Sequence, residues 1–334
     1  MEELAAELVQ YIAFRTTLVP KDVVNFALTS HHIHHALFGP ISSPNRYDQN
    51  QGKALGGVVA CAKAGWWDAA VLAVRRGYGD PCGKNNLPLR KAAKAGIKPL
   101  VVALLAAGAD PTVARNAPIR FAAFHGHIEL VELLLEVPDT NPAAQNNDAI
   151  IRAADNGHAD IVTRLLADER VDPRAQYSMA IKKAAGKGHV GVVGVLLEDG
   201  RVDPGVGRNA PLFEAARLGH AEVVRMLLEH PGVDPKARNS QVGTVVVQRG
   251  HVDVLNVLIE DGRVDLGASF SAPFLNAVVL GRVEMVRILL AHPDVDPLAS
   301  PETNVLEEAL SRHNQDIIAL LLADPRFQDQ KSNQ

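Results

Sequence analysis

The sequence is poor in the features that mark disulfide-rich, membrane-spanning and nucleic-acid-binding proteins. Its two cysteines, Cys61 and Cys82, are too few for a disulfide framework. No uninterrupted apolar run approaches the roughly eighteen residues that a membrane helix needs. A formal net charge of −4 gives no overall excess of positive charge for binding phosphates. The chain opens with Glu2, Glu3 and Glu7 where a secretion signal would be basic and then apolar. We therefore expect a soluble intracellular protein, cytoplasmic or nuclear or both, with no nucleic-acid or membrane partner.

The chain also lacks the local motifs of common enzyme chemistries. It contains no phosphate-binding Gly-x-x-x-x-Gly-Lys-Ser/Thr, no Gly-x-Ser-x-Gly elbow and no His-Glu-x-x-His. The cluster "HHIHH" at residues 31–35 is its densest group of imidazoles. Because a structural zinc site needs four converging ligands, a solvated basic helix face is the favoured interpretation and a metal site the alternative. We expect no enzymatic activity, no catalytic, cofactor-binding or metal-binding residue, and no small-molecule substrate.

The most informative feature present is a repeat with a period of 31 residues. Glycines recur at this step, with one step of 30, at Gly65, Gly96, Gly126, Gly157, Gly188, Gly219, Gly250 and Gly281. A second position in phase holds Asp80, Asp110, Asn141, Asp172, Asp203, Asp234, Asp265 and Asp296, most of them followed by proline. Two markers in phase predict a chain built from one repeated supersecondary unit.

Each repeat has the pattern of two short helices. In one repeat, the pair Ala215 and Ala216 suits close packing of the first helix against its neighbour, and Gly219 suits the left-handed residue that ends it. The second helix has Glu222 in its first turn, where the charge complements the helix dipole, and apolar residues at helical spacing within 223–228. Isolated helices of about ten residues are marginal in water. The repeats must therefore bury their apolar faces against one another, which predicts an all-α solenoid.

Two stretches of the sequence resemble the ankyrin repeat. They are "APIRFAAFHGHIELVELLL" at 117–135 and "APLFEAARLGHAEVVRMLL" at 210–228, which match its T-P-L-H-x-A-A, G-H and V-V-x-L-L-L positions. The resemblance covers residues 52–327 in about nine repeats and leaves a polar tail at 328–334. It implies an ankyrin solenoid that binds proteins without catalysis. Because the turn region is shorter than in the family, we expect short finger loops.

The period also predicts roles for several side chains. Five histidines follow the repeated glycine at the same position, His127, His158, His189, His220 and His251, so we expect one structural role for all of them. Cys61 occupies the alanine-pair position of the first repeat. We interpret it as a small buried apolar residue instead of a reactive thiol.

The positions that the resemblance places on the concave face are rich in positive charge. They are Arg90, Lys91, Lys94, Arg120, Phe124, His125, Arg152, Asp155, Lys182, Lys183, Lys187, Arg217 and Arg249. Ten of them are Lys or Arg and Asp155 is the single acid, with Glu214 beside the row. The hypothesis is that repeats two to six form a basic groove for an acidic segment of a partner protein. The alternative is an ordinary solvated helix surface. Phe124, Val279 and Leu280 are candidate apolar anchors.

Residues 1–40 do not share the period and are similar to the F-box. The positions that match are Leu4, Glu7, Leu8, Pro20, Asp22, Val23 and Leu28. In that family the module docks on the Skp1 adaptor of a cullin ubiquitin ligase, and a following repeat domain captures the substrate. Residues 41–51 have the composition of a linker. The leading functional prediction is therefore a substrate-recruiting adaptor. The alternative is a plain ankyrin scaffold whose N-terminal helices only cap the first repeat.

Overall fold

The computed structural model describes residues 58–332 apart from 66, 76, 78, 238–240 and 301–303. The F-box-like module at 1–40 and the linker at 41–51, both predicted from the sequence, lie outside the described residues. Every regular element within the described ranges is a helix, which confirms the all-α prediction. The contacts divide the chain into two units. Among the described residues, unit 1 comprises 58–153 and 163–171, and unit 2 comprises 154–162 and 172–332.

The helices alternate between a first and a second helix of each repeat. The first helices are α4 (Val58–Ala64), α6 (Gly83–Ala95), α8 (Val113–His125), α10 (Ala144–Asp155), α12 (Ala175–Lys187), α14 (Val206–Leu218), α16 (Gln241–Arg249), α18 (Ala268–Val279) and α20 (Val305–Ser311). The second helices are α5 (Trp67–Arg75), α7 (Lys98–Ala106), α9 (Ile128–Leu135), α11 (Ala159–Leu166), α13 (Val190–Glu198), α15 (Ala221–Glu229), α17 (Val252–Asp261), α19 (Val283–Leu290) and α21 (Gln315–Ala323). A last helix, α22 (Pro325–Ser332), extends into the predicted polar tail.

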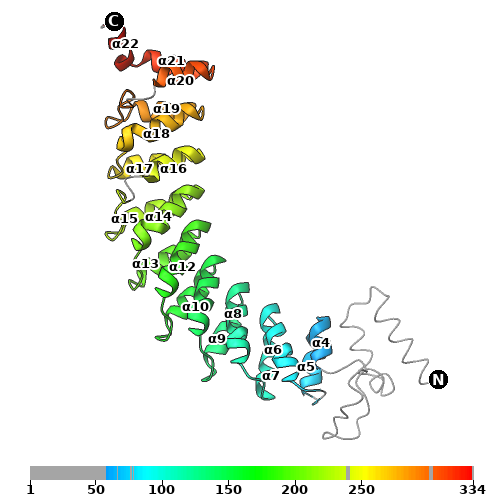
Figure 1. Cartoon of the computed structure of the whole chain (residues 1–334). Coiled ribbons are helices and arrows are strands. Elements are labelled where there is room, and N and C mark those ends of the chain that lie inside the picture. The colour runs from blue at the N-terminus through cyan, green and yellow to red at the C-terminus, as the bar shows by residue number, and fades with distance from the viewer. Residues whose placement is uncertain are drawn as a thin grey trace, which may run out of the picture. The chain divides into compact units, whose positions relative to one another are not determined.

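Within each unit, helices of the same kind pack on one another (Figure 1). In unit 1, α4, α6 and α8 stack in succession, and so do α5, α7 and α9. In unit 2, α12, α14, α16, α18 and α20 form one row of first helices, while α13, α15, α17, α19 and α21 form the row of second helices. This stacking confirms the solenoid architecture expected from the period. None of the helices in the described ranges has the length and apolar character that crossing a membrane requires.

The alanine pairs of the first helices are completely buried. Both residues of every pair are fully buried: Ala92 and Ala93, Ala122 and Ala123, Ala153 and Ala154, Ala184 and Ala185, Ala215 and Ala216. Val246 and Val247 take this position in α16 and are equally buried. Because a methyl group projects little from the helix, the backbones of neighbouring first helices can approach closely. Cys61 is buried at the same position, as predicted, and burial raises the pKa of its thiol.

The Gly-His pair links one repeat to the next. Gly188 ends α12 in the left-handed conformation, with φ 74°. The ring of His220, from the following repeat, covers this glycine, so that a Cβ built there would lie 2.6 Å from His220 Nδ1. His220 Nε2 lies 3.1 Å from the carbonyl oxygen of Gly186. Equivalent contacts join His127 to Lys94, His189 to Asp155 and His251 to Arg217. These contacts bear out the structural role expected for the recurring histidines at four of their five positions, His127, His189, His220 and His251.

The turn before each first helix has a feature that the sequence analysis missed. The repeated Asp accepts a hydrogen bond from the backbone N–H two residues later, as Asp110 does from Thr112 at 2.8 Å. Three residues that follow are left-handed, ending in a buried Asn or Ser such as Asn116. Asn116 Oδ1 then accepts from the backbone N–H of Asn141 in the next turn at 2.8 Å. Such a bond satisfies buried polar groups. It also stabilises the left-handed backbone conformation, which is unfavourable for most residues.

A second missed feature stabilises the ends of several second helices. Four Arg residues each pair with the Asp two positions earlier at 2.7 Å: Arg170 with Asp168, Arg201 with Asp199, Arg263 with Asp261, and Arg326 with Asp324. The guanidinium of Arg326 also donates to the carbonyl oxygens of Leu290 and Val295, at 2.7 and 2.8 Å. Hydrogen bonding from the Arg lowers the pKa of Asp168, Asp199 and Asp324. The pairs therefore connect successive repeats through charge-assisted hydrogen bonds.

Candidate protein-interaction surface

Part of each first helix remains at the surface because its other positions meet neighbouring helices. In α12, Ile181 and the alanine pair are buried, whereas Lys182, Lys183 and Lys187 keep contact with solvent. The predicted interaction residues all lie at these outward positions. Unit 1 holds Arg90, Lys91, Lys94, Arg120, Phe124, His125 and Arg152. Unit 2 holds Asp155, Lys182, Lys183, Lys187, Arg217 and Arg249. The predicted residues therefore form two groups, one on each unit.

In unit 1, one carboxylate holds two of the predicted cations. Asp148 Oδ2 accepts from Nε of Arg120 and Nε of Arg152, each at 2.5 Å. Only 19% of the Asp148 side chain and 16% of the Arg120 side chain are exposed. The guanidinium carbon of Arg152 also lies 5.5 Å from the ring centroid of Phe124, a cation–π contact. Asp148, which the sequence analysis did not place on this face, therefore neutralises part of the positive charge counted there.

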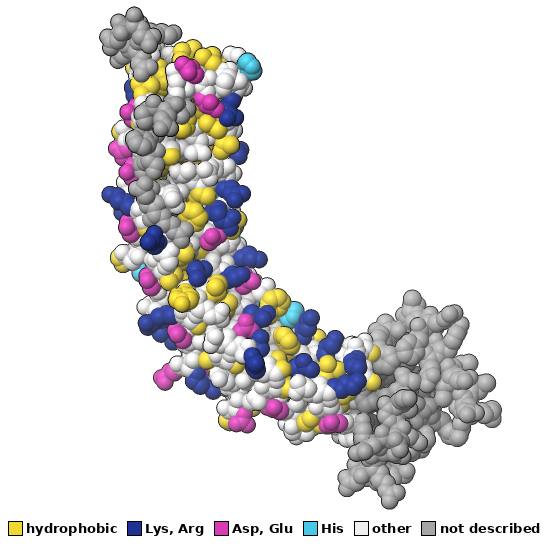
Figure 2. Space-filling view, in the orientation of Figure 1, with side chains coloured by type: hydrophobic (Ala, Val, Ile, Leu, Met, Phe, Trp, Pro, Cys, Tyr) yellow, Lys and Arg dark blue, Asp and Glu magenta, His cyan; other side chains and the backbone are white. Residues whose placement is uncertain are grey.

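The remaining positive charge of unit 1 gathers on α4 and α6. Lys91 and Lys94 are exposed, and within the described ranges no ion pair joins either of them to an acid. Lys63 of α4 interacts with Lys84 of α6, which carries the same charge, and this interaction lowers the pKa of Lys63. Figure 2 shows dark-blue Lys and Arg side chains gathered where α4 and α6 lie. Like charges held this close create a positive field that attracts anionic groups.

Lys63 was missed by the sequence analysis, although a signal for it exists. It stands 31 residues before Lys94 and thus occupies the same position of the repeat. Arg90, by contrast, was predicted correctly as a surface cation but is partly engaged within its own repeat. Its Nε donates to the carbonyl oxygen of Asn85 at 3.1 Å.

In unit 2, the lysines of α12 are the densest positive group. Lys183 Nζ lies 3.7 Å from Asp155 Oδ1, beyond hydrogen-bonding distance. Lys182 and Lys187 form no ion pair with any acid of the described residues. Arg217 differs, because it donates twice to Glu214 Oε2, at 3.0 and 2.6 Å. The net positive character of this row therefore comes mainly from α12.

The candidate apolar anchors differ in their surroundings. Phe124 packs edge-on against His125, with ring centroids 4.8 Å apart, and lies under Arg152. Val279 is half-buried in α18, and the neighbouring Leu280 is 46% exposed. Leu280 therefore offers apolar surface to a partner, whereas Phe124 is largely occupied by contacts within unit 1.

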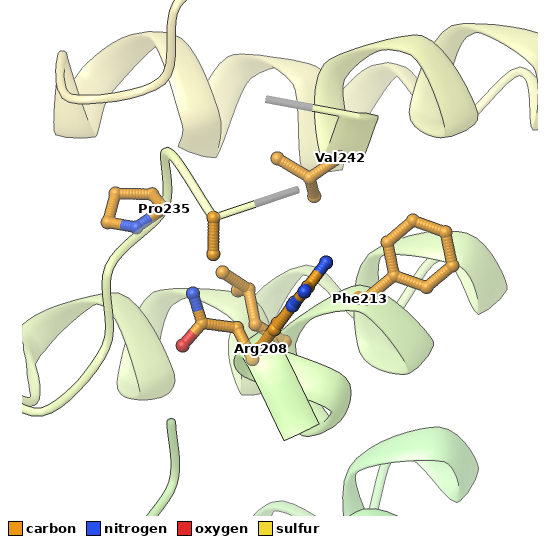
Figure 3. A pocket seen from close by; sticks show the side chains of 7 residues that line it. Arg208, Phe213, Pro235 and Val242 are labelled. Atoms are coloured by element: carbon orange, nitrogen blue, oxygen red, sulfur yellow. The ribbon is translucent and has the colours of Figure 1, made fainter. Parts of the chain in front are cut away.

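A small pocket lies between α14 and α16 of unit 2 (Figure 3). Arg208, Phe213, Pro235 and Val242 contribute to its walls. It encloses about 200 Å³ with its open mouth included, which is below the usual size of sites for drug-sized ligands. No acid and base converge in it. Elsewhere in the described ranges, no three His, Cys, Asp or Glu side chains are grouped so as to hold a metal ion. The histidines at 31–35 lie outside those ranges.

The stacked helix pairs define a class of protein, the all-α solenoid, whose exposed surface consists of repeated helix faces. Comparison with protein families specifies the repeat: residues 89–177 and 150–239 match the family model described as ankyrin repeats (3 copies). Ankyrin repeats are therefore detected over residues 89–239, and they support a role in protein–protein interaction and are typically non-enzymatic. The match does not extend to residues 1–40. A comparison with curated proteins finds no match.

Proposed function

We propose that the chain is a non-enzymatic protein-binding protein whose cationic first-helix surfaces capture an acidic segment of a partner. The observation that carries the proposal is the lysine group of α12. Lys182, Lys183 and Lys187 lie on the outward face of one helix, and the ion pair of Lys183 with Asp155, at 3.7 Å, is a long one. Because water screens the charge of exposed lysines and pairing restricts their side chains, each contact with a carboxylate contributes only about 0.2–1 kcal/mol. The surface therefore sets encounter rate and specificity more than affinity.

The cations of unit 1 support the same function independently. Lys91 and Lys94 are exposed on α6, and Lys63 and Lys84 are held close enough together to lower the pKa of Lys63. An acidic segment placed there would relieve this repulsion.

The test is a charge reversal on α12 in the full chain. Binding of a fluorescently labelled oligoglutamate peptide to the Lys183→Glu/Lys187→Glu variant is measured by anisotropy at two salt concentrations. We expect weaker binding and a shallower salt dependence than in the unaltered chain, because fewer charges attract the peptide. The matched control is Arg75→Glu/Lys236→Glu, which changes the net charge equally at exposed positions away from the first helices. Unchanged affinity and salt slope in the α12 variant would refute the proposal.

A more specific hypothesis is that the chain recruits substrates to a ubiquitin ligase through Skp1. It is supported by the F-box-like order of Leu4, Pro20 and Leu28, followed by a repeat domain. The test is co-purification of Skp1 with the full chain and with a truncated chain that starts at Gly52. Binding to the full chain alone supports the hypothesis. Absence of binding in both leaves a plain ankyrin scaffold.

A further inference from the structure

The outward face of the first helices changes character along unit 2. On α12 it carries three lysines, whereas on α18 and α20 it is mainly apolar. The apolar side chains of this face include Leu218 on α14, Val279 at the end of α18, Leu280 directly after it, and Leu310 on α20. Leu218 is 42% exposed, Leu280 46% and Leu310 50%. Yellow hydrophobic side chains are visible over α18 and α20 in Figure 2.

Single exposed leucines are common on protein surfaces, but the positions of these are related. Leu218 and Leu280 stand 62 residues apart, two periods, and therefore occupy the same position of the repeat. Leu310 follows Val279 by one period, on the neighbouring helix. Because α18 packs directly against α20, their outward side chains form one apolar area at the C-terminal end of the row.

We infer that unit 2 binds one partner segment that is acidic at one end and apolar at the other. The acidic end lies on α12 and the apolar end on α18 and α20. This inference rests on the proposed function and adds the chemistry and polarity of the ligand. Charge complementarity supports the polarity, because Glu307 of α20 is exposed beside the apolar area and repels acidic side chains from it.

The stacking also sets the length of the segment. Three helix-to-helix steps separate α12 from α18, and packed helices lie about 8–10 Å apart. The distance is therefore roughly 24–30 Å, which an extended chain spans with about eight residues at ~3.3 Å each. A shorter segment cannot reach both ends at once.

The experiment uses the full chain and labelled peptides that contain four glutamates and a Leu-Trp-Leu group. The two groups are either adjacent, which gives a seven-residue peptide of about 20 Å that cannot reach both ends, or separated by eight Gly/Ser residues, in both orders along the peptide. A control peptide has Ser in place of Leu-Trp-Leu. We expect the peptide with the eight-residue spacer, in one order, to bind at least about tenfold more tightly than both the peptide without a spacer and the Ser peptide. One buried leucine-sized side chain is sufficient for such a gain.

The variant Leu280→Asp should abolish that tenfold gain while leaving the salt dependence of oligoglutamate binding in place. Its matched control is Val102→Asp, at an equally exposed position on α7 of unit 1, where Val102 is 46% exposed. Circular dichroism melting of each variant shows that it is folded. The inference is wrong if Leu-Trp-Leu does not increase the affinity, or if Leu280→Asp and Val102→Asp have the same effect on it. In either case the proposed function still holds if salt-dependent binding of oligoglutamate persists. If sedimentation shows a dimer that Leu280→Asp dissociates, the area is an interface between copies and the inference is also overturned.

Discussion

Replacing Asp148 by Asn should change stability and binding in opposite directions. Asp148 accepts from Arg120 and Arg152, so its charge neutralises part of the outward face of unit 1. In the Asn variant one negative charge is lost, and the two guanidinium groups attract anions more strongly. The same change weakens the hydrogen bond from Arg120 that joins α8 to α10 and the bond from Arg152 within α10.

The magnitude follows from the burial of the three side chains. Charge-assisted hydrogen bonds contribute about 1.5–3 kcal/mol each. Here Asn keeps one acceptor oxygen, and Arg152 is 37% exposed and can be solvated. We therefore expect a loss of about 1–2 kcal/mol in the free energy of unfolding. For a chain of this size, each kcal/mol lowers Tm by about 2–4 °C.

Two assays separate these effects. Thermal melting by circular dichroism measures the stability, and anisotropy with the oligoglutamate peptide measures the affinity and its salt dependence. The control is Asp139→Asn, which makes the same charge change at an exposed turn position. We expect Asp148→Asn to melt earlier and to bind the peptide more tightly, with a steeper salt dependence. A less stable variant with unchanged affinity would refute the account of this face as a binding surface.

Three further predictions concern the contacts between repeats. Gly188→Ala should lower the free energy of unfolding, measured in urea, by about 1–2 kcal/mol or more, because φ is positive and the new Cβ meets the ring of His220. Adding His220→Ala should recover part of this loss. Purely additive losses in the double variant would contradict the clash. The lowered pKa of Asp324 means that its contribution to stability is complete above about pH 4 and is lost as pH falls through the folded-state pKa. Asp324→Asn should therefore reduce the fall in stability on acidification, and an unaltered acid profile would argue against the linkage. Arg326→Ala should speed hydrogen exchange in α19 and α21, because it removes two bonds to the preceding repeat; exchange confined to α22 would count against it.

The fold could be predicted from the sequence because its determinants repeat. The alanine pairs, the glycines and the Asp turns each recur at one position of the 31-residue repeat. Each is a weak predictor of local structure alone, but together, at a constant period, they predict the helix pairs and the turns between them. The left-handed turn was missed even though its last residue recurs as Asn86, Asn116, Asn147, Ser178 and Asn209. Three consecutive left-handed residues run against ordinary preferences, and propensity alone does not suggest them.

The candidate surface was less predictable because charge depends on partners. The sequence shows that Arg120 and Arg152 are cations, but their shared carboxylate, Asp148, comes near Arg120 only when α8 and α10 are in place. The sequence shows equally that Lys182 and Lys187 are cations, and these two lysines form no ion pair among the described residues. The arginine pair and the lysine pair cannot be distinguished in the sequence, but they differ in the net positive charge that they present to a partner. The F-box-like residues at 4–28 remain a prediction from sequence.

The most direct test of the central claim is a lysine-reactivity footprint of the full chain, with and without saturating oligoglutamate peptide. Mass spectrometry then measures the acetylation of each lysine by a small acylating reagent. The account predicts protection of Lys182, Lys183 and Lys187, while Lys98 and Lys236, which lie off the first helices, react as before. Protection of Lys98 and Lys236 with none on α12 would contradict the claim that the outward face of the first helices is the working surface.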